Sequence, residues 1–316
     1  MARAFLLSSL PCPYSHGEKR MENNLLGCRT QVITDILKQA EHGLLDCCKE
    51  CPWSPIDEPS VGFGVSCTVH GMNWNIENKA NSMIMVQDPG DTTPHRTGRL
   101  CAVHNAENPT DKTAQQNLQL WKAAVSLNWD APEDDEYLKK HYWTNTIMHG
   151  ASAETGLRER SKFETARECC SDVLALQILA LKPKVLIASG TVAVNNLHDI
   201  GVIARNWASI RHEFNAGAYC EEVNSWRGLP LFKVFCTYHT SAGVVNRTLS
   251  RKYDSVKTEK LIAEKSKMLN STESIIGFLS SYGKPASNAT DRGMRFLLNH
   301  WLDIGLEIRE QSKNTT

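Results

Sequence analysis

The stretch that decides the fold is ECCSDVLALQILALKPKVLIASGTVAVNNL, residues 168–197. Its first part belongs to a long apolar helix pattern over 163–181, which stops at Lys182-Pro183. The next run, KVLIASG, is short, apolar and bounded by turn residues, which is typical of a fully buried strand. Gly190 then begins a turn into TVAVNNL. The stretch therefore predicts a helix, a buried strand and a turn in direct succession.

The same alternation extends along the chain on both sides of this stretch. Apolar or β-branched runs predict strands, and apolar residues at helical spacing predict helices. The further predicted strands are SMIMVQ (82–87), YWTNTIM (142–148) and LPLFKVFCTYH (229–239), and the further helices are 30–45 and 113–129. Strands that alternate with helices indicate βαβ units. The predicted fold is a three-layer α/β/α sandwich with a short, mainly parallel central sheet.

This pattern divides the chain into three parts. We expect a partly disordered N-terminal extension over 1–29, one α/β domain over 30–254 and a C-terminal helical appendage over 255–316. The appendage is rich in Lys, Glu and Ser and contains helical stretches such as GMRFLLNHWLDIGLEI.

Composition limits the possible partners. Lys+Arg and Asp+Glu both number 35 in 316 residues, so the formal net charge is zero and no overall positive field draws the protein to DNA or an anionic membrane. DNA binding therefore needs a local basic patch. No apolar stretch is long enough to span a bilayer, and the N-terminus fits a signal peptide poorly because its apolar part is short and contains two serines. We expect an intracellular monomer, in the cytoplasm or with the chromosome in a nucleoid or nucleus.

Three polar residues follow predicted strands that are far apart in the sequence. Asp88, Asn145 and His239 each lie at or near the carboxyl end of a strand. Ligands of parallel α/β sheets bind beyond these ends, so the three side chains are expected to converge on one crevice. Each residue alone more often has a structural role, as a turn former, a backbone hydrogen-bonder or a satisfied core histidine. Only the combination favours a functional site.

The cysteines form a second group of candidate residues. The chain has 11 cysteines, and DCCKECPW (46–53) contains Cys47, Cys48 and Cys51. An odd, clustered count is unlike the disulfide framework of a small secreted domain. It indicates a reducing compartment in which some cysteines bind a metal.

Four segments together resemble the uracil-DNA glycosylase superfamily. They are VQDPG, YWTNTIMHG, ECCSDVLALQILALKPKVLIASGTVAVNNL and TYHTSAGVVNR, in this order. The resemblance is closest to the iron–sulfur branch. It implies an enzyme that flips deoxyuridine out of DNA, cleaves its N-glycosidic bond and leaves an abasic site.

The resemblance also implies roles for individual residues. Asp88 would position water and stabilise the sugar cation, Asn145 would match uracil O4 and N3–H, and His239 would stabilise the departing uracil. Further implied contacts to the base are Gln87, Gly90, Leu100, Cys101 and Ser241. Implied contacts to DNA are Val244, Arg247 and Arg251.

In the iron–sulfur branch, four ligands hold a [4Fe–4S] cluster. The matching positions here are Cys48, Cys51, His149 and Cys170, where His149 stands in place of the usual cysteine. Cys169 competes with Cys170, and Cys47 with Cys48. Imidazole is known as an iron–sulfur ligand, and a Cys₃His set also suits zinc. A cluster, a zinc ion and no metal at all remain alternatives.

Some residues depart from the family pattern. Gly90 stands where the best-known uracil enzymes have a tyrosine that excludes thymine, and Leu100 and Cys101 lie nearest to the usual stacking phenylalanine. An open pocket keeps alternative lesions in view, such as hypoxanthine or mismatched thymine. A catalytically inactive DNA-binding member is a further alternative. An unrelated α/β enzyme with CCKEC as a redox centre is the last.

Overall fold

The computed structural model describes residues 35, 38–39, 42–54, 62–63, 82–87, 116, 120, 141–150, 159–215, 217–241, 243–269 and 288–313. At its centre is a five-stranded sheet with the order β3-β2-β5-β7-β6. The strands are β2 (Ser82–Val86), β3 (His141–Asn145), β5 (Val185–Ser189), β6 (Tyr219–Val223) and β7 (Phe232–Thr237). The first four in the sheet order are parallel, and β6 pairs antiparallel with β7 at the edge.

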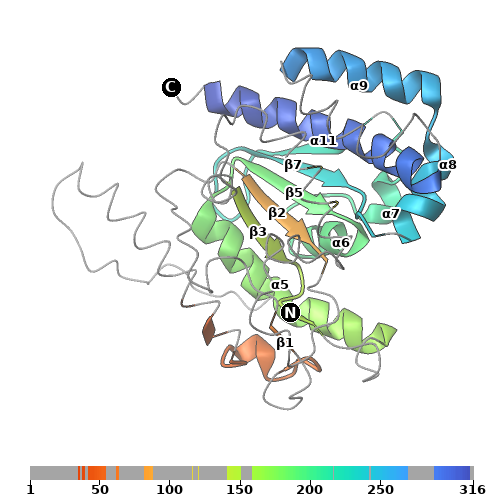
Figure 1. Cartoon of the computed structure of the whole chain (residues 1–316). Helices are drawn as coiled ribbons and strands as arrows, with labels where there is room; N and C mark the ends of the chain where they lie inside the picture. The colour runs from red at the N-terminus through yellow and green to blue at the C-terminus, as the bar shows by residue number, and fades with distance from the viewer. Residues whose placement is uncertain are drawn as a thin grey trace.

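Helices cover both faces of this sheet. On one face lie α5 (Arg160–Leu181) and α6 (Thr191–Asp199), and on the other lies α11 (Ala289–Lys313) (Figure 1). α9 (Ser255–Leu269) packs along α11 on the outside. The architecture is the predicted three-layer α/β/α sandwich. None of the helices in the described ranges is long and apolar enough to span a membrane.

Shorter elements complete the described structure. β1 (Gly62–Phe63) and β4 (His149–Gly150) form a separate two-stranded antiparallel sheet. The remaining elements are η2 (Asp46–Cys48), α7 (Trp207–Ile210), η5 (Val244–Leu249) and α8 (Ser250–Lys252). η5 is a single stretch of π-helix that leads directly into α8.

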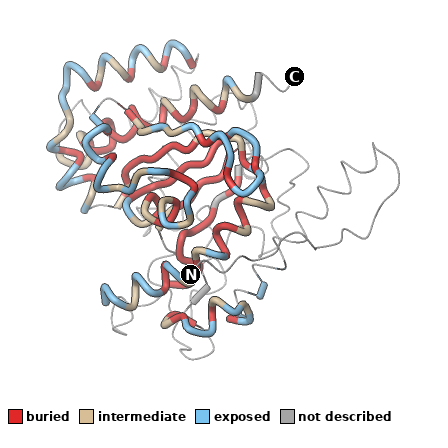
Figure 2. The backbone as a smooth tube through the Cα atoms, turned by 180° about the vertical axis from the view of Figure 1, so that it is seen from behind, coloured by how far each residue is buried: buried red, intermediate tan, exposed pale blue. Residues whose placement is uncertain are grey.

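The sheet and the C-terminal helix share one hydrophobic core. Every residue of β5 is buried, as are the first four residues of β2, and the strands form the buried centre of Figure 2. Leu297, Trp301 and Leu302 of α11 belong to the same cluster of buried side chains. Burying side chains of this size contributes about 1.5–3 kcal/mol each. The limits of the predicted appendage stay a prediction, but its described helix α11 is part of this core.

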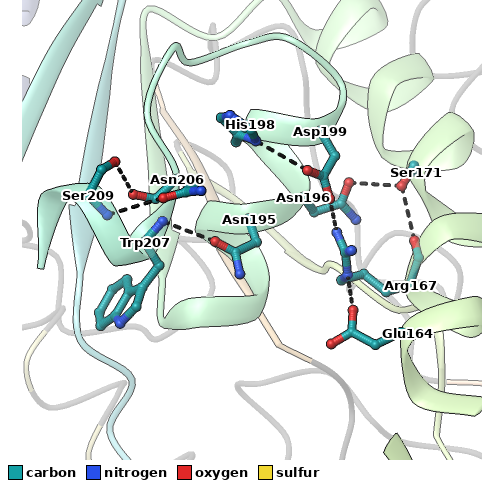
Figure 3. A network of polar contacts seen from close by, with 10 residues as sticks. All are labelled: Glu164, Arg167, Ser171, Asn195, Asn196, His198, Asp199, Asn206, Trp207 and Ser209. Carbon is teal, nitrogen blue, oxygen red and sulfur yellow. Dashed lines mark hydrogen bonds and ion pairs between the residues drawn. The ribbon is translucent and has the colours of Figure 1, made fainter. Parts of the chain in front are cut away.

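Polar contacts fix α6 against its neighbours (Figure 3). The largely buried guanidinium of Arg167 on α5 pairs with Glu164 at 2.9 Å and with Asp199 at the end of α6. The Ser171 hydroxyl donates to the Asn196 Oδ1 atom at 2.9 Å. These contacts hold α6 in a fixed position, and the first residue of α6 lies at the edge of the sheet where β5 ends.

Most predicted elements lie where the sequence puts them, with changed ends. The strand predicted over 142–148 ends at Asn145, and residues 146–148 form a bend in which the Ile147 N–H donates to the Gln87 carbonyl at 3.0 Å. The helix predicted over 163–181 begins at Arg160. The antiparallel strand β6 was not predicted. The helix predicted over 113–129 lies outside the described residues, apart from positions 116 and 120, which are helical.

Candidate active site

The carboxyl ends of four parallel strands meet at one edge of the sheet. Asn145 is the last residue of β3 and pairs in register with Val86 of β2, after which comes Gln87. Gly190 follows β5, and His239 lies two residues beyond the end of β7. β3 and β7 are separated by three strand spacings, or about 14 Å. Side chains at the carboxyl ends of β3 and β7 can therefore face a nucleoside placed over the ends of β2 and β5, which lie between them.

Buried hydrogen bonds to α5 fix the part of β3 that leads to Asn145. Gln177 of α5 is fully buried, and its Oε1 atom accepts hydrogen bonds from the Tyr142 hydroxyl at 2.7 Å and the Thr144 hydroxyl at 2.9 Å. These contacts tie β3 to α5 just before Asn145, which is only 7% exposed. A buried amide presents one acceptor and one donor group, as base recognition requires.

His239 is half-buried, and a local hydrogen bond sets its tautomer. The Ser241 backbone N–H donates to the His239 Nδ1 atom at 3.1 Å. Because Nδ1 is the acceptor, the proton of the neutral ring sits on Nε2. In this tautomer the ring offers the Nε2–H group as a donor, which suits an oxygen that gains negative charge.

Gly190 brings the β5–α6 turn directly against His239. A Cβ atom at Gly190 would lie 2.8 Å from the His239 Cβ atom, and the glycine has a φ of +94°. Its N–H also donates to the Thr237 carbonyl at 2.8 Å. The first N–H groups of α6, which have no partner within the helix, therefore begin beside His239. Such groups are suited to a phosphate of DNA.

The segment from His239 to Lys252, called the histidine segment below, leads away from the site along η5 and α8. The N–H groups of Val244 and Val245 both donate to the Ser241 carbonyl, at 2.9 and 3.0 Å. Val244 is half-buried and packs against the core, whereas Arg247 and Arg251 are exposed. The exposed guanidinium groups are accessible to a phosphate backbone.

The model of the uracil DNA glycosylase superfamily matches residues 75–263, which is more than half of the chain. The chain belongs to the uracil DNA glycosylase superfamily. No curated protein matches the chain at a significant level. The superfamily resemblance is thus confirmed, whereas assignment to the iron–sulfur branch stays a prediction. Membership indicates a DNA glycosylase, a hydrolase of DNA repair that acts on DNA.

The structure brings four of the predicted superfamily residues to the same sheet edge: Asn145, His239, Gln87 and Ser241. Four others, Asp88, Gly90, Leu100 and Cys101, lie outside the described residues. Asp88 directly follows Gln87, whose carbonyl accepts the Ile147 N–H at 3.0 Å. The last described residue before Asp88 is therefore tied to the turn after Asn145.

Sequence reasoning missed the contact between Gly190 and His239. It identified Gly190 only as the start of a turn, although glycine between a buried strand and a helix is a signal for close backbone approach. The sequence also gave no indication of what lies beneath β7, because that neighbour is provided by a helix more than fifty residues further along the chain.

The clustered cysteines come together from two distant parts of the chain. η2 packs against α5, so that Cys47, Cys48 and Cys51 face Cys169 and Cys170. The thiols of Cys51 and Cys169 share a hydrogen bond, which raises the pKa of Cys51 and lowers that of Cys169.

Cys170 is the most enclosed of these thiols. Its Sγ atom accepts the Met148 N–H at 3.4 Å, and burial raises the pKa of its thiol to about 12. His149 follows Met148 in β4 and is also buried.

The side chains of this group are of types that bind metals, and they come from two elements that pack together. Soft thiolate donors favour iron–sulfur clusters and zinc, and here they converge from η2 and α5. Within the described part of the chain, however, no group of three or more His, Cys, Asp or Glu side chains is close enough to hold a metal ion. The ligand set Cys48, Cys51, His149 and Cys170 therefore stays a prediction.

Proposed function

We propose that the protein is a monofunctional uracil-DNA glycosylase. It hydrolyses the N-glycosidic bond of a deoxyuridine that has been flipped out of DNA and leaves an abasic site. One observation carries this proposal: Asn145 and His239 lie at the same edge of the sheet, on either side of the strand end that continues into Gln87 and Asp88.

Each of the three side chains has a distinct task in this reaction. Bond cleavage builds negative charge on uracil O2 and positive charge on the sugar. The neutral Nε2–H of His239 donates to O2, because the Ser241 N–H occupies Nδ1. The buried amide of Asn145 pairs with uracil O4 and N3–H. The Asp88 carboxylate orients the attacking water and stabilises the sugar cation.

Release of uracil from a single-stranded oligonucleotide tests this proposal. We expect Asp88→Asn and His239→Ala each to lower the single-turnover rate by about 10²-fold or more. Asp254→Asn is a matched control, because Asp254 only caps α9 through the Lys257 N–H at 2.9 Å and asparagine caps equally well. Wild-type rates for both site variants would refute the mechanism.

The lesion itself is tested by a panel of oligonucleotides. By the superfamily resemblance, Gly90 stands where the best-known uracil enzymes have a tyrosine that excludes thymine, so hypoxanthine and mismatched thymine belong in the panel beside uracil. Faster release of either base would assign that lesion in place of uracil. Salt-dependent DNA binding without release of any base would indicate a member that has lost catalysis.

We also propose that the cysteines hold a [4Fe–4S] cluster, with zinc as the alternative metal. Cys48, Cys51, His149 and Cys170 are the proposed ligands, with Cys169 as the substitute for Cys170. The metal would have a structural role, because it would join η2 to α5. Thiols release protons when they bind a metal, so burial of Cys170 is compatible with binding only because the cation replaces the proton.

The visible spectrum and the metal content distinguish these alternatives. An iron–sulfur protein is brown and contains iron, whereas a zinc protein is colourless. We expect Cys51→Ser to lose the metal and Cys220→Ser to keep it, because Cys220 is an exposed residue of β6 outside the cysteine group. Purified protein without iron or zinc would exclude both metals.

A further inference from the structure

α11 lies outside the range matched by the superfamily, which ends at residue 263, yet it lies directly beneath the histidine segment. We infer that α11 is a positioning element of the active site, which holds His239 in place through His300 and seats η5 through Gly293. The inference rests on the proposed role of His239. It concerns how this chain holds that side chain.

The first contact joins His300 to the end of β7. His300 is fully buried, its Nε2 atom lies 2.9 Å from the Phe214 carbonyl, and its Nδ1 atom lies 3.3 Å from the Thr237 hydroxyl. A carbonyl only accepts, so Nε2 carries the proton and Nδ1 accepts from Thr237. His300 thereby orients the residue that lies two positions before His239.

Thr237 is linked to His239 through Gly190. Its carbonyl accepts the Gly190 N–H at 2.8 Å, and Gly190 in turn packs directly on the His239 Cβ atom. The Ser189 hydroxyl donates to the Tyr238 carbonyl at 3.3 Å. The end of β7 is thus fixed from α11 on one side and from the β5–α6 turn on the other.

An aromatic cluster adds to the same support. The Tyr238 ring lies 5.1 Å from Trp207, 5.0 Å from Phe214 and 6.0 Å from His300, measured between ring centroids. The rings of Phe214 and His300 are stacked at 5.9 Å. His239 therefore follows a residue whose side chain has little freedom to move.

The second contact joins Gly293 to η5. A Cβ atom at Gly293 would lie 2.2 Å from the Val245 carbonyl oxygen and 2.8 Å from Val245 Cγ1. Glycine within a helix costs about 1 kcal/mol relative to alanine, so its presence here has a packing reason. One turn earlier, the Thr290 hydroxyl donates to Asn246 Oδ1 at 2.7 Å. The two backbones meet closely where the histidine segment becomes helical.

Two site-directed variants test the inference. His300→Phe keeps an aromatic ring but removes both hydrogen bonds, and Gly293→Ala places a methyl group against the Val245 carbonyl. Ile308→Ala is the matched control, because Ile308 is a buried core residue of the same helix, about 12 Å beyond His300 and about 22 Å beyond Gly293. All three should lower the melting temperature. Only the first two should lower the single-turnover release of uracil, by about 10–100-fold at saturating DNA.

Two readouts distinguish positioning from a general loss of stability. The ¹⁵N resonances of the His239 ring report the hydrogen bond at Nδ1, and they should shift in His300→Phe and Gly293→Ala but not in Ile308→Ala. A double-mutant cycle tests the contact between His300 and Thr237. The double variant His300→Phe/Thr237→Val should slow release by less than the combined effects of the two single variants.

The outcomes separate this inference from the proposed function. If the wild-type protein releases no base, the proposed function fails, and the His239 resonances still decide the inference. Folded His300→Phe and Gly293→Ala proteins with wild-type release rates and unshifted His239 resonances would overturn it.

Discussion

Two histidines of this protein, His239 and His300, differ in burial and in the hydrogen bonds that they make. His239 is half-buried at the sheet edge, with its Nδ1 atom occupied by the Ser241 N–H. His300 is fully buried between α11 and β7, and burial lowers its pKa to about 3. In the proposed function, the first donates a hydrogen bond to the substrate, whereas the second stays neutral and contacts the backbone around it.

Burial of His300 makes the folded state sensitive to acid. Its pKa falls from 6.5 to about 3 on folding, chiefly through burial and further through the charges of Lys265 and Lys252. Between these two values the unfolded chain binds a proton that the folded protein does not, so stability is full above pH 6.5 and falls as the pH decreases toward 3. The His300→Phe variant should not lose this stability at low pH, because phenylalanine binds no proton. From about pH 7 to about pH 4.5, wild type should lose about 2–3 kcal/mol more than the variant. Urea unfolding at the two pH values measures the difference, and equal losses would contradict it.

Asn145 should decide which pyrimidine is accepted. Asn145→Asp keeps the size of the side chain but replaces the amide donor with an acceptor, so the match to uracil O4 is lost. We expect release of uracil to fall by about 10²-fold, with weaker discrimination against cytosine. Competition assays with uracil and cytosine oligonucleotides measure both effects. Asn224→Asp, on an exposed bend after β6, makes the same change away from the site and should have no effect.

At the scale of elements, the β5–α6 turn packs directly against His239, the proposed catalytic histidine. Gly190→Ala introduces a Cβ atom 2.8 Å from His239 Cβ and strains a residue whose φ is +94°. Gly201 is a matched control, since it has a φ of +75° but nothing lies within 4 Å of the point that a Cβ atom would occupy. Backbone strain should cost each variant about 1–2 kcal/mol of stability, and the contact with His239 should add to the cost of Gly190→Ala. Only Gly190→Ala should also slow base release, by about 10-fold or more. Equal rates for the two variants, measured in single turnovers, would contradict the contact.

Elements with a strong apolar pattern were predictable from the sequence. β2, β5 and β7 follow apolar runs, because a parallel sheet covered on both faces buries most strand residues. α5 follows apolar residues at helical spacing. β6 was missed because it lacks such a run. YCEEV is an edge strand in which only Val223 is buried, so its apolar pattern is weak. The end of β3 lies at a bend in which the Ile147 N–H donates to the Gln87 carbonyl, a contact that only the folded sheet creates.

The site was predictable to a similar extent. Asn145 and His239 follow strands that the sequence reveals, and parallel topology brings them to one edge. The contributions of Gly190 and His300 were not predictable, because each depends on a neighbour supplied by another element of the folded chain. Local patterns specify where strands end, whereas tertiary packing specifies what holds the residues at those ends.

The whole molecule has no net charge, so its affinity for DNA must come from few basic residues. Arg247 and Arg251 are exposed on the histidine segment, beside the proposed site. Each arginine that contacts a phosphate of single-stranded DNA releases counterions and adds about 0.7 to the steepness of the salt dependence. We therefore expect Arg247→Ala and Arg251→Ala each to lower this slope by about 0.7. Lys260→Ala, on the outer helix α9, removes the same charge but should leave the slope unchanged. Fluorescence anisotropy between about 50 and 200 mM salt measures the slopes. If all three variants have the same slope as wild type, the histidine segment is not the surface that meets DNA.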